Sequence, residues 1–280
     1  MSEVFLIMIV IAMSCSLIGN ILVISNQSMV ADALSHSILL GIVMGFFLTQ
    51  DLYSPLLLIG ASVFGVLTII MIETIHSQKI AHDAATGLVF TFFFALSVML
   101  ISLFARNVHL DLDMVLMGEV LFAPFVRSQL LGVDMPLALV RGIVLFLSLS
   151  LFYLLFFWRL SLYLFDKTQA RLVGVKVILL KLLLMFLVSL TIVLAFDSLG
   201  SITVISFLVA PAMLASLWSQ TFLSFTLLSL TFSVLLASLG YYLGMFFDVT
   251  LSGITAVVAL VSFLTMMLLK SVVYRSTKSE

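Results

Sequence analysis

Long uncharged apolar runs recur along the whole chain, separated by short polar or turn-forming clusters. A helix needs about 20 apolar residues to cross the hydrocarbon core of a bilayer, whereas the strands of a membrane barrel alternate apolar and polar positions. Runs this uniform therefore predict membrane-spanning helices. The expected spans are 4–24, 29–48, 52–72, 86–105, 137–157, 176–196, 201–218, 221–246 and 252–270. The fold class is thus all-α, a polytopic bundle of about eight or nine spans.

The composition excludes a protein that works in water. Of the 280 residues, 64% are hydrophobic and only 9% are charged, against about 25% charged in a typical soluble domain. Neither a separate catalytic head nor a nucleic-acid-binding module fits into what remains outside the spans. Since no low-complexity linker divides the chain, we expect residues 1–280 to form a single transmembrane domain that is embedded in a lipid bilayer.

Basic residues near the span ends predict the orientation, because cytoplasmic loops are enriched in Lys and Arg. They cluster in and beside the connector 158–175 and again in the tail after residue 270. Both segments should therefore be cytoplasmic. Counting spans from there places 73–85 inside and 106–136 outside. The N-terminus lies outside if all nine runs cross the membrane.

An acid and a histidine open the second apolar run. Asp32 and His36 are four residues apart, so on a helix their side chains lie on one face, about one turn apart. A carboxylate inside a membrane costs several kcal/mol unless it is paired or faces a water-filled path, which favours a function. Carboxylate oxygen and imidazole nitrogen together suit a divalent first-row metal such as Mn, Zn or Fe. Two ligands are too few to retain an ion tightly. Such weak retention is what a transport site requires, because the ion must be released again.

Two other interpretations of this pair stay open. The first is purely structural: Asp32 and His36 form a hydrogen-bonded pair that joins neighbouring helices. The second is a proton- or sodium-coupled secondary transporter in which Asp32 is the titrating group. An intramembrane metalloenzyme is disfavoured because the sequence has no His-Glu-x-x-His motif.

Two further positions are candidates for lining a pathway. Glu119 belongs to a half-apolar stretch, 112–126, that we expect to form a short helix dipping into the bilayer. Its carboxylate would face a water-filled path or lie among the lipid headgroups. Pro211 is expected to break the span 201–218 and to free backbone carbonyls, which membrane proteins tolerate where helix ends line a cavity. A kink without a function is the alternative.

The connector 73–85 is polar and rich in histidine, and a solvated face explains such a loop more simply than a metal site does. Its acidic and histidine residues are Glu73, His76, His82 and Asp83.

The connector 158–175 contains a short capped helix. Asp166 is a good N-cap residue and Gly174 a good terminator, with a helical stretch between them. Such a compact amphipathic helix on the cytoplasmic side is either a surface for a partner protein or a simple loop.

Five segments together resemble the metal-type permeases of ABC importers, which carry manganese, zinc or iron(II) in bacteria. Residues 32–41 read D-A-L-S-H-S-I-L-L-G and follow Ala31, similar to the family's G-D-A-[IL]-S-H-A-x-x-P-G. The order and spacing of the remaining segments extend the resemblance over nearly the whole chain. They are 82–87, 112–118, 166–174 and 200–215, the last around Pro211. Departures from the pattern are Ala31 for Gly, Leu40 for Pro and Met117 for Phe.

This resemblance implies a fold like that of type II ABC importer permeases and a location in the bacterial inner membrane. It implies that Asp32 and His36 are the metal-coordinating pair. It also implies that Asp166, Ala170 and Gly174 belong to a coupling helix that docks into the ATPase subunit. The implied partners are a second permease chain, an ATP-binding subunit and an extracytoplasmic metal-binding protein.

The chemistry of ATP is expected on a separate subunit. The sequence contains no G-x-x-x-x-G-K-[ST] loop to hold its phosphates, so the chain itself is not an enzyme and needs no cofactor of its own. Hard oxygen and nitrogen ligands without thiolate favour manganese as the cargo, and zinc and iron(II) stay open. The segment 118–124 is similar to the second permease of systems with two different permeases, which leaves both a heterodimer and a homodimer possible.

Overall fold

The computed structural model describes residues 2–51, 54–104, 120–130 and 133–277. Within these ranges, nine helices are long and apolar enough to cross a membrane, which confirms the all-α class and the predicted runs. They are α1 (Ser2–Ile24), α2 (Met29–Thr49), α3 (Pro55–Ile75), α4 (His82–Phe104), α6 (Leu137–Phe165), α8 (Val177–Leu199), α9 (Ser201–Trp218), α10 (Phe222–Phe247) and α11 (Leu251–Thr277). Shorter elements are a 3-10 helix, η1 (Val120–Phe125), two strands, β1 (Arg127–Leu130) and β2 (Val133–Pro136), and α7 (Lys167–Leu172).

Most helix boundaries lie close to the predicted ones, and the exceptions have local causes. Helix α3 begins where the Ser54 hydroxyl accepts a hydrogen bond from the Leu56 amide, with Pro55 at the first helical position. Helix α6 continues to Phe165, so the first half of the connector predicted at 158–175 is helix. Its 29 residues span about 43 Å at 1.5 Å per residue, which exceeds the ~30 Å hydrocarbon core.

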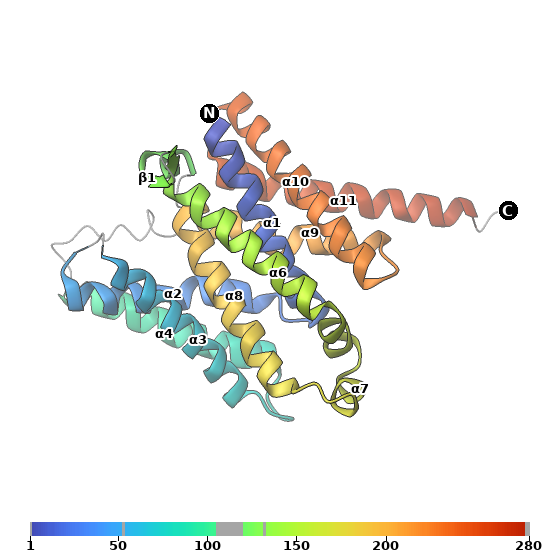
Figure 1. Cartoon of the computed structure of the whole chain (residues 1–280), viewed down its shortest axis with the longest axis horizontal. Coiled ribbons are helices and arrows are strands. Elements are labelled where there is room, and N and C mark those ends of the chain that lie inside the picture. The colour runs from blue at the N-terminus through green and yellow to red at the C-terminus, as the bar shows by residue number, and fades with distance from the viewer. Residues whose placement is uncertain (1, 52–53, 105–119, 131–132, 278–280) are drawn as a thin grey trace.

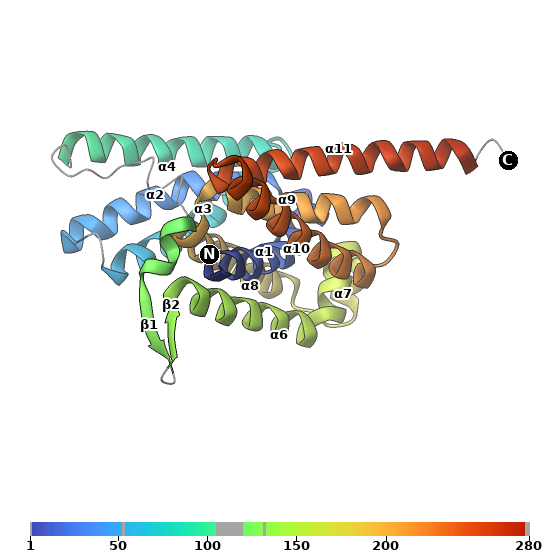
Figure 2. The same ribbon diagram turned by 90° about the horizontal axis from the view of Figure 1, so that it is seen from above.

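The helices pack into two groups, visible in Figures 1 and 2. In the first, α1 is surrounded by α6, α8, α9 and α10, with α11 packed on α9 and α10. The second consists of α2, α3 and α4, which share a smaller apolar core that includes Leu40, Ile72 and Phe93. Helix α8 contacts both α2 and α3. It therefore joins the two groups.

Helices α2, α3 and α8 approach one another through residues with small side chains. A Cβ atom built on Gly41 of α2 would lie 2.2 Å from the carbonyl oxygen of Gly60 in α3. A Cβ on Gly65 of α3 would lie 2.2 Å from the Ser189 hydroxyl of α8. Small residues at such positions let membrane helices pack backbone to backbone. The three helices therefore form one tightly packed row.

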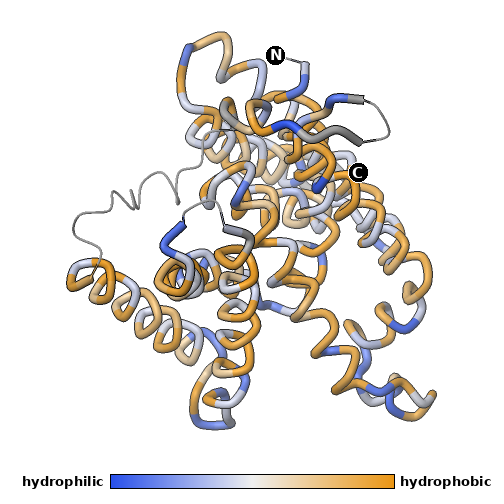
Figure 3. The backbone as a smooth tube through the Cα atoms, turned by 60° about the vertical axis from the view of Figure 1, so that its left-hand side comes forward, coloured by the Kyte–Doolittle hydropathy of each residue, from blue (hydrophilic) through white to orange (hydrophobic). Residues whose placement is uncertain are grey.

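Ion pairs show which connectors share an end of the bundle. Arg127 of β1 lies 3.1 Å from a carboxylate oxygen of Glu3, so the N-terminus and the hairpin lie at the same end (Figure 1). Lys181, near the start of α8, pairs with Glu73 near the end of α3, which places α7 and the α3–α4 turn together at the other end. Hydrophilic colour gathers mainly where the chain turns (Figure 3). The arrangement agrees with the predicted alternation of spans; which end faces the cytoplasm stays a prediction.

The antiparallel hairpin of β1 and β2 was not expected from the sequence. Arg127 lies opposite Pro136 in its register, and the Arg127 side chain also pairs with Asp134 at 2.8 Å. The hydrogen bond with Glu3 and the charges of the two acids raise the pKa of Arg127. Of the helix expected at 112–126, residues 112–119 lie outside the described ranges, and Val120–Phe125 form the 3-10 helix η1.

Candidate metal pair and coupling segment

The predicted pair, Asp32 and His36, lies at the start of α2. Asp32 is in the first turn, where the positive end of the helix dipole stabilises a carboxylate. His36 Nε2 lies 3.7 Å from Asp32 Oδ1. The side chain of Asp32 is 48% exposed and that of His36 is 32% exposed, although most of the helix around them is buried. The pair is therefore a partly exposed polar site on a helix that is otherwise mostly buried.

Aromatic side chains of α4 fix the position of the His36 ring. Its centroid lies 5.2 Å from that of Phe94 and 5.8 Å from that of Phe90. His36 Nδ1 is buried and has no hydrogen-bond partner among the described residues. The nitrogen that faces Asp32 is Nε2. The ring is thus held by apolar contact, with one nitrogen directed toward the carboxylate.

This geometry does not fit the structural interpretation of the pair. Both residues are on α2, so their contact joins no neighbouring helices, and 3.7 Å is too long for a hydrogen bond. Metal ligands lie about 2.0–2.2 Å from a first-row ion, so two atoms at this separation can both contact one ion. Within the described ranges no group of three or more His, Cys, Asp or Glu side chains is placed to hold a metal. A complete coordination shell needs additional ligands.

Of the two predicted pathway residues, Pro211 lies in the described part of the chain, inside α9. Glu119 lies outside the described residues. The prediction that Pro211 breaks its span is wrong, because α9 runs without interruption from Ser201 to Trp218 and Pro211 is buried inside it. Proline inside a helix is tolerated more often in membrane proteins than in soluble ones.

The predicted capped helix is present as α7. The Asp166 carboxylate accepts hydrogen bonds from the amides of Thr168 and Gln169, both at 2.9 Å. Gly174 ends the turn with a φ of +83°, a conformation that glycine adopts at little cost. Ala170 is fully buried against its own chain, so it positions α7 and does not form its outer surface. That surface carries Arg171 and Leu172, which the sequence did not single out.

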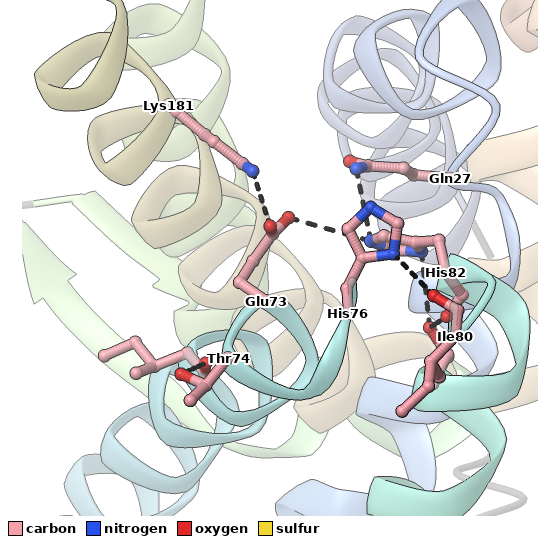
Figure 4. Close-up of polar contacts among 9 residues, drawn as sticks. Gln27, Glu73, Thr74, His76, Ile80, His82 and Lys181 are labelled. Carbon is pink, nitrogen blue, oxygen red and sulfur yellow. Dashed lines mark hydrogen bonds and ion pairs between the residues drawn. The ribbon is translucent and has the colours of Figure 1, made fainter. Parts of the chain in front are cut away.

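The polar residues of the predicted connector 73–85 occupy helix ends. Glu73 lies near the end of α3, whereas His82 and Asp83 are in the first turn of α4. Figure 4 shows Glu73 between Lys181 of α8 and the ring of His82. The solvated face expected from the sequence is therefore, in part, an interhelical network. Lys181 was the feature of the sequence that could have indicated this network, since it is a lone cation in a long apolar helix and needs an acidic partner.

The fold is that of a polytopic membrane protein. Comparison with known sequences gives the particular family: residues 1–270 match the model of the ABC 3 transport family, and the chain belongs to it. It is therefore a permease subunit of an ABC transporter, whose ATPase is a separate subunit. This assignment favours ATP-driven transport over the secondary transporter considered above.

Named relatives and solved structures agree with this assignment. The chain is 37% identical over 250 residues to the manganese transport system membrane protein MntD of Bacillus subtilis, covering 89% of this chain and 84% of MntD. It is 40% identical over 210 residues to the zinc transport system membrane protein TroD of Treponema pallidum, covering 75% of this chain and 57% of TroD. The structure of PsaBC from Streptococcus pneumoniae in complex with Fab matches with a TM-score of 0.75 and 27% identity, covering 95% and 90% of the respective chains.

Proposed function

We propose that this chain imports manganese across the bacterial inner membrane, with Asp32 and His36 as transient ligands of the passing ion. The observation that carries the proposal is the open Asp32–His36 pair, whose Oδ1 and Nε2 atoms lie 3.7 Å apart on α2. The names of MntD and TroD support manganese or zinc as cargo. Oxygen and nitrogen donors without thiolate favour manganese over softer ions.

A second permease chain would complete the site. The exposed fractions of Asp32 and His36 leave room for ligands from outside this chain. An equivalent pair from a homologous or identical partner would supply four ligands, enough for tetrahedral zinc, and water would extend the shell for manganese. Few ligands from each chain allow the ion to be released.

Helix α7 would couple ATP hydrolysis on the partner subunit to movement of this chain. We propose that residues 1–280 act as one permease domain whose connector 158–175 contains the coupling segment, with Asp166, Ala170 and Gly174 shaping it for the ATP-binding subunit. Its exposed basic and apolar side chains, Arg171 and Leu172, support a protein contact there. An extracytoplasmic metal-binding protein would deliver the ion at the opposite end, where the hairpin and the N-terminus lie.

Manganese uptake by cells that express the complete transport system tests the pair. Asp32→Ala and His36→Ala should each reduce uptake at least tenfold, because losing even an outer-shell partner costs about 10–100-fold in metal affinity. Asp51→Ala is the matched control, since Asp51 is a carboxylate just beyond the other end of α2. The control should transport normally. Unchanged uptake in both site variants would refute the metal role.

Two additional arms of this assay address the cargo and the energy source. Competition of labelled Mn²⁺ uptake by Zn²⁺ or Fe²⁺ ranks the three candidate ions. Uptake that survives collapse of the proton and sodium gradients while ATP is maintained supports ATP-driven import. Uptake that collapses with the gradients would instead revive the secondary transporter with Asp32 as its titrating group.

A further inference from the structure

A polar network at one end of the bundle is centred on Glu73 (Figure 4). One carboxylate oxygen of Glu73 accepts a hydrogen bond from Lys181 Nζ at 2.5 Å, and the other lies 3.6 Å from His82 Nε2. The side chains of Glu73, His82 and Lys181 are only 23%, 19% and 35% exposed. Because they are partly shielded, their charges are screened less than those of a surface pair.

His82 extends the network to the connector that precedes α2. Its Nε2 lies 3.3 Å from Gln27 Nε2, which places the Gln27 side-chain amide within hydrogen-bond distance of the ring. Its Nδ1 is 3.4 Å from the Thr86 hydroxyl. Four parts of the chain therefore meet here: the α1–α2 connector, the end of α3, the start of α4 and the start of α8.

The network adjoins the coupling segment. Residues 173–176 connect α7 to α8, and the turn is closed by a hydrogen bond from the Val175 amide to the Ala170 carbonyl at 2.9 Å. Lys181 follows in the second turn of α8. A short turn thus links α7 directly to the first turns of α8, which carry the Lys181 side chain.

The network also adjoins the helix that carries the metal pair. Gln27 precedes the first residue of α2, and Asp32 lies in that helix's first turn. The close contacts of Gly65 with Ser189 and of Gly41 with Gly60 hold α8, α3 and α2 in a packed row. Packed helices of this kind shift as units and do not deform continuously.

The same residues do not form a second metal site. The ammonium of Lys181 occupies one oxygen of Glu73 and would repel a cation. No group of three or more metal-ligating side chains is placed to bind an ion in the described part of the chain. Transmission of movement explains the arrangement better than ion binding.

We propose that the Lys181–Glu73 pair, held against His82 and Gln27, is a positioning element that transmits movement of the coupling segment to α2. This inference rests on the proposed function, because α2 matters through Asp32 and His36. The pair acts through other residues and contacts neither the ion nor ATP.

The test measures Mn²⁺ ions transported per ATP hydrolysed, with the complete transporter and its binding protein in lipid vesicles. Lys181→Met keeps the apolar stem and removes the charge, and Glu73→Gln keeps the shape of the acid. Each should lower the transport ratio about tenfold while ATP hydrolysis continues, within the range typical of coupling between sites. The exchanged pair, Glu73→Lys with Lys181→Glu, should recover much of the ratio.

Arg141→Met provides the matched control. Arg141 of α6 pairs with Asp197 of α8 at 2.5 Å, and its side chain is 36% exposed, close to the 35% of Lys181. The pair lies at the far end of α8 from the coupling segment. Its transport ratio should equal that of the wild type. An equal fall in this control would overturn the proposal, as would a wild-type ratio in both single variants. Transport and hydrolysis that fall together, without recovery in the exchanged pair, would assign a merely structural role and also overturn it.

Binding of Mn²⁺ to the purified complex separates this inference from the proposed function. The Lys181→Met and Glu73→Gln variants should bind Mn²⁺ as the wild type does, whereas Asp32→Ala should not. If the Asp32→Ala variant bound and transported Mn²⁺ normally, the proposal that Asp32 is a metal ligand would be refuted. The transport ratio of the Lys181 and Glu73 variants would still report on coupling, because it counts ions without reference to their ligands.

Discussion

The contact between α2 and α3 yields a quantitative prediction through Gly41→Ala. The new Cβ would lie 2.2 Å from the Gly60 carbonyl oxygen and 2.7 Å from the Ala61 amide nitrogen. Ordinary contact begins near 3.4 Å, so the difference, 3.4 minus 2.2, requires the helices to separate locally by about 1.2 Å. Backbone atoms block the space, and no side-chain rotation can relieve the clash.

The expected cost follows from that separation. Overpacking a well-packed core typically costs about 1–3 kcal/mol, and replacing a helical glycine by alanine returns up to ~1 kcal/mol through helix propensity. A net destabilisation of roughly 1–2 kcal/mol is expected. Because α2 carries Asp32 and His36, manganese uptake should fall as well.

Thermal unfolding of the purified permease in detergent, measured beside manganese uptake, tests this expectation. Gly87→Ala is the control, because a Cβ on Gly87 in α4 meets no atom within 4 Å. It should leave stability unchanged or raise it by up to about 1 kcal/mol. If Gly41→Ala were as stable as Gly87→Ala, the backbone-to-backbone packing of α2 on α3 would be refuted.

Two further predictions concern α7. Asp166→Ala removes the acceptor for the Thr168 and Gln169 amides, which costs about 1 kcal/mol. ATP hydrolysis stimulated by the binding protein should therefore fall in this variant, whereas Asp166→Asn should retain it. Equal ATP hydrolysis in the two variants would contradict the capping role. Gly174→Val places a β-branched residue at φ +83°, which costs about 1–2 kcal/mol. The number of ions transported per ATP should drop in this variant and much less in Gly174→Asn. A normal transport ratio in the valine variant would count against this turn as part of the coupling segment.

The membrane spans could be predicted well because each depends on local composition alone. A run of apolar residues must form a helix in lipid, where every backbone amide and carbonyl needs a partner within its own segment. The cap at Asp166 was predictable for the same local reason, since its partners lie two and three residues away. The hairpin was missed because its two strands have only four residues each, too few to show a clear alternation of apolar and polar positions.

In the candidate site too, some features follow from the local sequence and others depend on how the helices pack. Helical periodicity alone places Asp32 and His36 on one face. The support of the His36 ring by Phe90 and Phe94 depends on how α4 packs. The sequence shows Lys181 as a lone cation in an apolar run, but its contacts with Glu73 and, through Glu73, with His82 could not be predicted because the three residues come from three helices.

By itself, the sequence determined that the chain is a helical membrane bundle with one acid–imidazole pair at the start of its second span and a capped segment between two later spans. Only the tertiary structure decided that Ala170 faces inward, that Pro211 leaves its helix intact and that Glu73 lies beside Lys181. Hydrophobicity and backbone hydrogen bonding act between residues near in sequence, so they can be read along the chain. Side-chain contacts between distant helices depend on their packing angles and on the small residues that let them approach, so they emerge only from the assembled fold.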